Sequence, residues 1–220
     1  MNRDKPSKQA LRIAVLISGG GTTLQNFVER INDGRLCGVE IVQVISSRGD
    51  VRGVDIAREV GLPLSILRKR DSVDIDAYSD ALARGLDAVG ADLAVMGGFL
   101  SLWRIPPRYE GRVLNIHPAL LPNFGGRGMF GHHVHEAVLA AGERESGCTV
   151  HLADNLYDHG PIIAQARVPV FPEDDAAALA QRVGTAEREL YPRVLQGVAE
   201  EGLSWLTRHR ESPLLMNDVS

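Results

Sequence analysis

Two side chains with complementary chemistry stand two positions apart near the middle of the chain. Asn115 and His117 belong to a short apolar run that ends at Pro118. Alternate residues of a strand share one face, so both side chains are expected to project together. An amide can donate to a developing oxyanion while an imidazole moves a proton near neutral pH, which suits acyl chemistry. A histidine next to a proline is also an ordinary packing residue, and spacing alone leaves that alternative open.

An acid further along the chain could serve this histidine. Asp158 lies in the segment Asp154–Gly160, which joins two apolar runs and is longer than a hairpin needs. A carboxylate near His117 would hold the orientation of the imidazole and stabilise its protonated form. Spacing alone equally allows a solvated turn acid.

A glycine-rich turn supplies a candidate anion site. Ser18–Leu24 follows an apolar run and opens a helical pattern, so backbone N–H groups at the helix start can face a phosphate. Thr22 or Thr23 can both cap the helix and bond a phosphate oxygen. A dinucleotide-binding turn would need glycine in place of Leu24, and the Gly-Lys-Ser/Thr of a Walker loop is absent. The turn therefore indicates a site for one phosphate monoester, or a tight turn that uses glycines for packing alone.

Two other features are candidate ligand sites. Glu187 falls at the edge of the buried stripe of a long helical pattern, where an acid either extends to solvent or binds a ligand such as ribose hydroxyls. The histidines at 132, 133 and 135 lack the i, i+4 pair or the His-Glu-x-x-His spacing of a metal site. A polar helix start is expected there, and no metal site is predicted.

The elements that must position these residues alternate between strand and helix, which predicts an α/β fold with a doubly wound, mostly parallel sheet and an antiparallel C-terminal extension. The expected strands are Leu11–Ile17, Val39–Ile45, Leu64–Leu67, Leu93–Met96, Arg112–Ile116, Cys148–Ala153 and Pro161–Val170. The expected helices lie near 24–31, 54–60, 75–89, 132–141 and 173–198, with a long loop at Pro118–Gly131. We expect a flexible N-terminus at 1–10, one domain at 11–207 and a polar, mobile tail at 208–220.

Composition restricts the partners. With 24 Lys and Arg against 28 Asp and Glu the net charge is −4, so no overall basic field is available to bind nucleic acid. The N-terminal residues are polar, no run of 18 apolar residues occurs, and two cysteines form no framework. We therefore expect a cytoplasmic protein with small-molecule partners and no membrane partner; a homodimer is left open.

Four sequence runs together resemble the phosphoribosylglycinamide formyltransferase family. They are Ile17–Gln25, Gly97–Phe99, Leu114–Pro122 and Asp158–Ile163, and the resemblance extends from about Leu11 to about Gly197 with the motifs in order. It implies a Rossmann-like formyltransferase fold and transfer of a formyl group from the co-substrate 10-formyltetrahydrofolate to the glycinamide amine of a phosphoribosyl substrate in purine biosynthesis, with no metal.

The resemblance also implies roles for individual residues. Asn115, His117 and Asp158 would be catalytic, with Asp158 keeping His117 charged. The acceptor substrate would bind Gly21, Thr22, Thr23 and Glu187. The folate would contact Leu100, Ser101, Leu102, Trp103, Asn115, Asp154, Asn155, Leu156, Tyr157 and Asp158.

The chain departs from the family pattern at three places. Family members often have Asn and Ser where this chain has Gly20, Thr22 and Thr23, and Gly is common at the position of His159. The stretch Gly125–His133 is longer than in several members, and we expect a mobile loop near the substrate amine. Its arginine, Arg127, either helps to hold phosphate or folate or lies on the surface.

Three other functions are considered. A formyltetrahydrofolate deformylase resembles this catalytic core joined to an N-terminal regulatory module, and only ten residues precede the first predicted strand here. A methionyl-tRNA formyltransferase would need a C-terminal RNA-binding domain and a basic patch, neither of which is visible. A catalytically inactive phosphoribosyl or folate sensor is disfavoured by an intact Asn115, His117 and Asp158.

Overall fold

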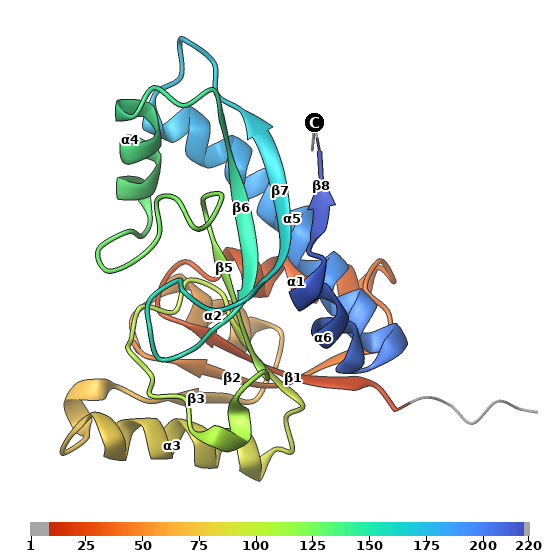
Figure 1. Ribbon diagram of the computed structural model, residues 1–220. Helices are drawn as coiled ribbons and strands as arrows, with labels where there is room; N and C mark the ends of the chain where they lie inside the picture. The colour runs from red at the N-terminus through yellow and green to blue at the C-terminus, as the bar shows by residue number, and fades with distance from the viewer. Residues whose placement is uncertain (1–8, 218–220) are drawn as a thin grey trace, which may run out of the picture.

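A mixed eight-stranded sheet with helices on both faces forms the centre of the computed structural model, which describes residues 9–217 (Figure 1). The strands are β1 (Leu11–Ile17), β2 (Val39–Ser46), β3 (Leu64–Ile66), β4 (Leu93–Met96), β5 (Val113–His117), β6 (Glu145–Leu152), β7 (Ile162–Pro169) and β8 (Leu214–Met216). The α-helices are α1 (Thr22–Asn32), α2 (Arg52–Glu59), α3 (Ile75–Ala88), α4 (His132–Ala140), α5 (Ala176–Glu201) and α6 (Ser204–Glu211).

The strand order explains where a ligand can bind. The order is β3-β2-β1-β4-β5-β6-β7-β8, with β1 to β5 parallel and β6 antiparallel to both of its neighbours. The chain moves outward from β1 to β3 and then returns to β4 on the other side of β1, so the loops that leave β1 and β4 diverge. A crevice at the carboxyl ends of the strands is expected at such a switch point. The predicted doubly wound sheet with an antiparallel extension is confirmed.

Alternate side chains of β1 enter two separate cores. Ile13, Val15 and Ile17 pack with residues of α1, α2 and α5 on one face, whereas Ala14 and Leu16 pack with α3 on the other. All five side chains are fully buried. Because helices cover both faces, β1 is apolar without interruption from Ile13 to Ile17, which is the pattern of a buried parallel strand.

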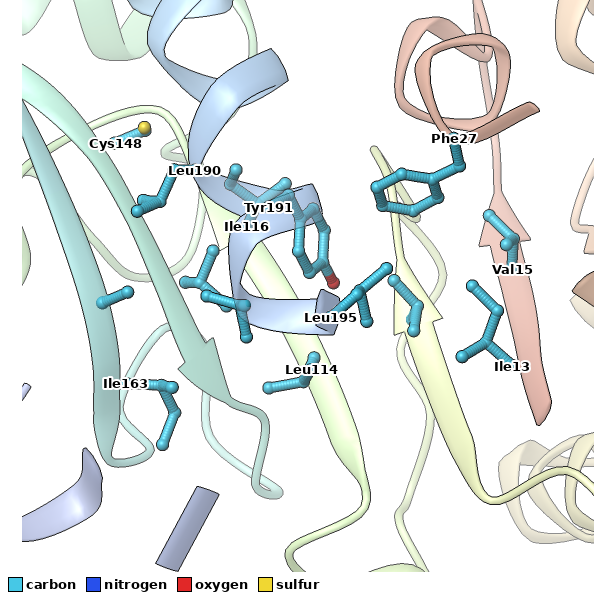
Figure 2. Close-up of a cluster of buried hydrophobic side chains, with 14 of the residues drawn as sticks. Ile13, Val15, Phe27, Leu114, Ile116, Cys148, Ile163, Leu190, Tyr191 and Leu195 are labelled. Carbon is cyan, nitrogen blue, oxygen red and sulfur yellow. The ribbon is translucent and has the colours of Figure 1, made fainter. Parts of the chain in front are cut away.

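Helix α5 is anchored in the larger core, and this fixes the residues at its middle. In Figure 2 Leu190, Tyr191 and Leu195 of α5 point toward the sheet, and the Tyr191 ring meets Phe27 of α1 edge-on at 5.4 Å between centroids. The Tyr191 hydroxyl donates a hydrogen bond of 3.2 Å to the carbonyl of Met96 at the end of β4. The helix turn before Tyr191, which carries Glu187, is therefore held at the carboxyl end of the sheet.

The C-terminal segment differs from the prediction. We expected a polar, mobile tail at 208–220, but α6 continues to Glu211 and β8 pairs in parallel with β7. Leu214 and Met216 pack against the larger core while Leu215 between them is exposed. Three residues are too few for a periodic pattern to reveal a strand. Of the predicted N-terminal segment 1–10, residues 1–8 lie outside the described residues.

Candidate active site

A cavity of about 660 Å³ opens at the carboxyl ends of β1, β4 and β5, where the strand order predicts a ligand site. Its walls come from five segments that are distant in sequence, together with four single residues. They are residues 19–23, 96–103, 115–118, 126–131 and 153–158, with Ile105, His135, His151 and Glu187. Every residue that the sequence analysis assigned to the site lines this one cavity.

The glycines of the turn after β1 divide into two kinds. Gly21 has a φ of +72°, and a Cβ atom there would lie 2.5 Å from the Cα atom of Gly53 in α2, so packing requires this glycine. Cβ atoms at Gly19 and Gly20 would meet no atom within 4 Å. These two positions face open space in the cavity wall, so a ligand can approach the backbone there.

The start of α1 leaves its first backbone N–H groups uncapped. Gly21 is the N-cap residue in a left-handed conformation, and no side chain accepts a hydrogen bond there. The expectation that Thr22 or Thr23 caps the helix is therefore wrong, because both residues already lie inside its first turn. Uncapped N–H groups at a helix start carry partial positive charge and suit an anion.

The contacts of His117 define its neutral tautomer. The ring is 3% exposed, and its Nε2 lies 2.8 Å from the carbonyl oxygen of Phe124. A carbonyl only accepts, so Nε2 carries the proton. Nδ1 lies 3.5 Å from Oδ2 of Asp158. The nitrogen with a free lone pair in the neutral ring is therefore Nδ1, on the side of the carboxylate.

A second histidine orients the side-chain amide of Asn115. Strand pairing sets Asn115 of β5 opposite His151 of β6. The Nδ1 of His151 lies 3.1 Å from the carbonyl of Leu152 and must donate to it, so its Nε2 accepts from the Asn115 Nδ2 at 3.0 Å. This bond fixes which end of the Asn115 amide is the donor end.

The carboxylate of Asp158 lies between the two imidazoles. Its Oδ2 accepts a hydrogen bond of 3.0 Å from the backbone N–H of Gly126 and faces His117, while its Oδ1 lies 3.6 Å from Nε2 of His151. Both loops that hold His117 contain a strained residue: Phe124 and Asp158 have φ values of 56° and 51°, and no other non-glycine residue within the described range 9–217 has a positive φ. Such strain persists where surrounding structure enforces it, and it clusters at functional sites.

Burial sets the charge of the histidine. It lowers the pKa of His117 below its ordinary value, and the charge of Asp158 and the Phe124 carbonyl only partly oppose this effect. Burial raises the pKa of Asp158, but the His151 ring, the charge of His117 and the Gly126 N–H outweigh it, so that pKa lies below its ordinary value. Burial thus favours the neutral imidazole, whereas Asp158 favours the charged form. That Asp158 keeps His117 charged during the reaction stays a prediction.

Glu187 differs from the other acids of the cavity. Burial raises its pKa to about 7, against a smaller lowering by the neighbouring Arg188. A carboxyl group near half protonation can both donate and accept hydrogen bonds. This property suits a ligand that is rich in hydroxyl groups.

Comparison with known proteins identifies the family. Residues 11–195 match the formyl transferase family. A phosphoribosylglycinamide formyltransferase from Escherichia coli is 33% identical over 211 residues, which span 92% of this chain and 97% of that protein. The chain belongs to the phosphoribosylglycinamide formyltransferase family.

Other proteins are similar to this chain. The chloroplastic phosphoribosylglycinamide formyltransferase of Arabidopsis thaliana is 37% identical over 94% of this chain and 70% of that protein. A trifunctional purine biosynthetic protein of Drosophila melanogaster is 39% identical over 86% of this chain, but the match spans only 14% of that protein. The phosphoribosylglycinamide formyltransferase structure from Coxiella burnetii has a TM-score of 0.79 at 37% identity, covering 87% of this chain and 88% of that chain.

In this phosphoribosylglycinamide formyltransferase family member, the residues predicted to bind folate form one part of the cavity wall. Two segments contribute, namely Leu100–Trp103 and Asp154–Asp158. The Asn155 side chain holds the second segment against the chain just after the first, because its Oδ1 accepts a hydrogen bond of 2.7 Å from the N–H of Ile105. Asn155 therefore supports the wall through its side chain. Folate binding by these segments stays a prediction.

Two contributors to the site were not predicted from the sequence. One is His151, whose signal was its place opposite Asn115; finding it required the register between β5 and β6. The other is the carbonyl of Phe124, which sets the His117 tautomer through backbone geometry and has no sequence signal. Thr149 also supports the site, since its hydroxyl binds the carbonyl of Ala119 and the N–H of Leu121 after β5.

The structure also bears on the predictions for Arg127 in the long loop and for the histidines at 132, 133 and 135. Arg127 is exposed and lines the cavity, and its ligand stays a prediction. His132 begins α4, as a polar helix start predicts, but His135 is buried against the cavity. Among the described residues, no cluster of three or more His, Cys, Asp or Glu could hold a metal ion. Nor does any helix within that range combine the length and apolar character needed to cross a membrane.

Proposed function

We propose that this protein transfers the formyl group of 10-formyltetrahydrofolate to the glycinamide amine of 5′-phosphoribosylglycinamide. The arrangement of Asn115, His117 and Asp158 around one cavity carries the proposal. The same cavity reaches the uncapped start of α1 and the carboxyl group of Glu187, which provide for a phosphate and for ribose hydroxyls. The folate would lie along Leu100–Trp103 and Asp154–Asp158.

In the first step the substrate amine attacks the formyl carbon. A new C–N bond forms, and the carbonyl electron pair moves onto oxygen. The free N–H of the Asn115 amide donates to that oxyanion, since its other N–H is held by His151. Nδ1 of neutral His117 accepts the proton that the amine loses, and the Asp158 carboxylate stabilises the resulting imidazolium.

In the second step the tetrahedral intermediate collapses. The oxyanion re-forms the carbonyl, the bond between the formyl carbon and the folate nitrogen breaks, and that nitrogen takes the proton from His117. The imidazole returns to its neutral tautomer with Nε2 still bonded to Phe124. Tetrahydrofolate and the formylated acceptor then leave. The proton that the amine lost has passed through His117 to the folate nitrogen.

A folate-linked absorbance assay tests the proposal against its rivals. With both substrates we expect tetrahydrofolate to appear in equal amount to formylated acceptor, and no tetrahydrofolate to appear without acceptor. Release without acceptor would instead indicate a deformylase, and no release in either condition would indicate a binding module. A cytoplasmic location and a homodimer stay predictions.

A further inference from the structure

A second, smaller cavity adjoins the start of α1. Its volume is about 260 Å³, and it lies between α1 and α5. Three of its lining residues, Thr22, Thr23 and Glu187, also line the main cavity. A phosphate seated at the start of α1 would therefore face both cavities. The remaining lining residues are Asn26, Ala180, Gly184 and Arg188.

Arg188 brings a positive charge into this second cavity. Its guanidinium lies over Gly184, since a Cβ atom at Gly184 would stand 3.6 Å from Nη1 of Arg188. The glycine therefore leaves the side chain room to lie along the helix. Nη2 donates a hydrogen bond of 2.9 Å to the hydroxyl of Thr185. Among the described residues 9–217 no carboxylate forms an ion pair with Arg188, and its charge acts on the neighbouring Glu187, whose pKa it lowers.

The backbone of Arg188 is fixed relative to the phosphate turn. Asn26 of α1 donates from Nδ2 to the carbonyl of Arg188 at 2.9 Å. The amide oxygen of Asn26 in turn accepts from Nε of Arg30 at 3.1 Å, and Arg30 pairs with Glu189. Asn26 and Arg30 are both buried. Helices α1 and α5 are thus joined by a polar network one turn into α1, directly below Thr22 and Thr23.

A guanidinium would add positive charge to a phosphate site that is otherwise formed by backbone amides. The protein has a net charge of −4, so attraction must be local. Arg127 and Arg188 are the cationic side chains that line the two cavities, and Arg127 lines only the main one, on the loop before α4. An arginine with donor groups free of carboxylates is well suited to a phosphate.

We propose that Arg188 binds the 5′-phosphate of the acceptor substrate from the side of α5, opposite the backbone N–H groups of α1. This inference rests on the proposed function, because it takes the acceptor to be a phosphoribosyl compound. The phosphate then contacts α1 through its amides and α5 through one guanidinium. Arg188 acts on binding of the acceptor and has no part in the formyl transfer step.

Kinetics with two acceptors test the inference. We expect Arg188→Ala to raise the acceptor KM roughly tenfold or more, the loss of a charge-assisted hydrogen bond, with kcat and the folate KM unchanged. The glycinamide riboside without its phosphate should show the same KM with parent and variant. Arg188→Lys should recover part of the affinity. Arg193→Ala provides the matched control, because Arg193 is an exposed arginine of α5 that lines neither cavity.

Two results would overturn the assignment of Arg188. One is an unchanged KM for the phosphorylated acceptor in Arg188→Ala; the other is an equal rise for both acceptors, which would indicate a structural role. Calorimetric titration with ribose 5-phosphate separates this inference from the proposed function. Weaker binding by Arg188→Ala without any formyl transfer by the parent would retain Arg188 and reject the formyl transfer. If the parent transfers the formyl group but parent and Arg188→Ala bind ribose 5-phosphate equally well, formyl transfer is retained and the role of Arg188 is rejected.

Discussion

The two ends of the main cavity are built in different ways. At the proposed phosphate end, one short turn joins β1 to α1, and the groups offered to a ligand are backbone N–H groups of consecutive residues. At the catalytic end, Asn115 and His117 come from β5, His151 from β6, and Asp158 from the loop after β6. One end needs a single local conformation, whereas the other needs three segments brought together in register.

This contrast shows where backbone strain is required. The phosphate turn meets its conformational demand with glycine, which has no Cβ penalty at a φ of +72°. At the proposed catalytic end glycine at position 158 would remove the carboxylate to which we assign a role, and a φ of 51° is imposed there on a residue with a side chain. A non-glycine residue held in the left-handed region of φ costs roughly 1–3 kcal/mol of folding free energy. Strain is accordingly found beside His117 and absent from the phosphate turn.

His117→Asn is expected to have the largest effect, and to act on only one end of the cavity. Asparagine cannot accept and return a proton, so kcat should fall by roughly 10²–10³ or more. Acceptor binding, measured by calorimetry, should stay nearly unchanged because the phosphate turn is untouched. Turnover within tenfold of the parent would show that the assignment of His117 is wrong.

A matched histidine variant and a pH profile sharpen this result. His133→Asn changes an exposed histidine of α4 outside the cavity and should leave kcat unchanged. Since burial lowers the pKa of His117 and the neutral ring accepts the proton, activity of the parent should fall as the pH drops through a value below 6.5. A rate that rises over that range would favour a charged His117 instead.

Glu187→Gln, at the phosphate end of the cavity, is expected to change the free energy of unfolding of the protein. The folded-state pKa of about 7 lies above the ordinary value of 4.5, so the folded protein holds this proton more tightly than the unfolded chain. The free energy of unfolding should therefore fall as the pH rises from 4.5 to 7, by at most about 3 kcal/mol. The cavities beside the carboxyl group admit water, which reduces this figure.

The test for Glu187 compares urea unfolding of parent and variant at two pH values. Glu187→Gln should equal the parent near pH 4 and exceed it at pH 8, while the acceptor KM rises through weaker ribose contacts. A stability difference that does not change with pH would contradict the raised pKa.

Thr22→Asp probes the phosphate end by charge. An added carboxylate in the first turn of α1 should repel the phosphate and raise the acceptor KM by roughly tenfold, with kcat retained. The same charge favours the helix start, so stability should not decrease. Ala177→Asp places an equal charge in the first turn of α5, outside both cavities, and serves as the control. An unchanged acceptor KM in Thr22→Asp would argue against a phosphate at this turn.

The same contrast explains what the sequence could predict. Local patterns sufficed for the sheet and for the glycine turn, because their geometry depends on neighbouring residues. Asn115 and His117 could be paired because they alternate along one strand. The partnership of Asn115 with His151 depends on register across β5 and β6, and the tautomer of His117 depends on the Phe124 carbonyl in a strained loop. Neither property is encoded in residue spacing.

The smallest effect is expected for His159→Ala, at the rim of the catalytic end. His159 is an exposed side chain whose Nδ1 lies 2.8 Å from Oδ2 of Asp154. Exposed pairs contribute less than about 1 kcal/mol, so the urea midpoint should change little and the folate KM should stay within about threefold of the parent. Only buried groups at this end would then control catalysis. A tenfold rise in folate KM with unchanged stability would instead make His159 a folate contact and extend the catalytic end to its exposed rim.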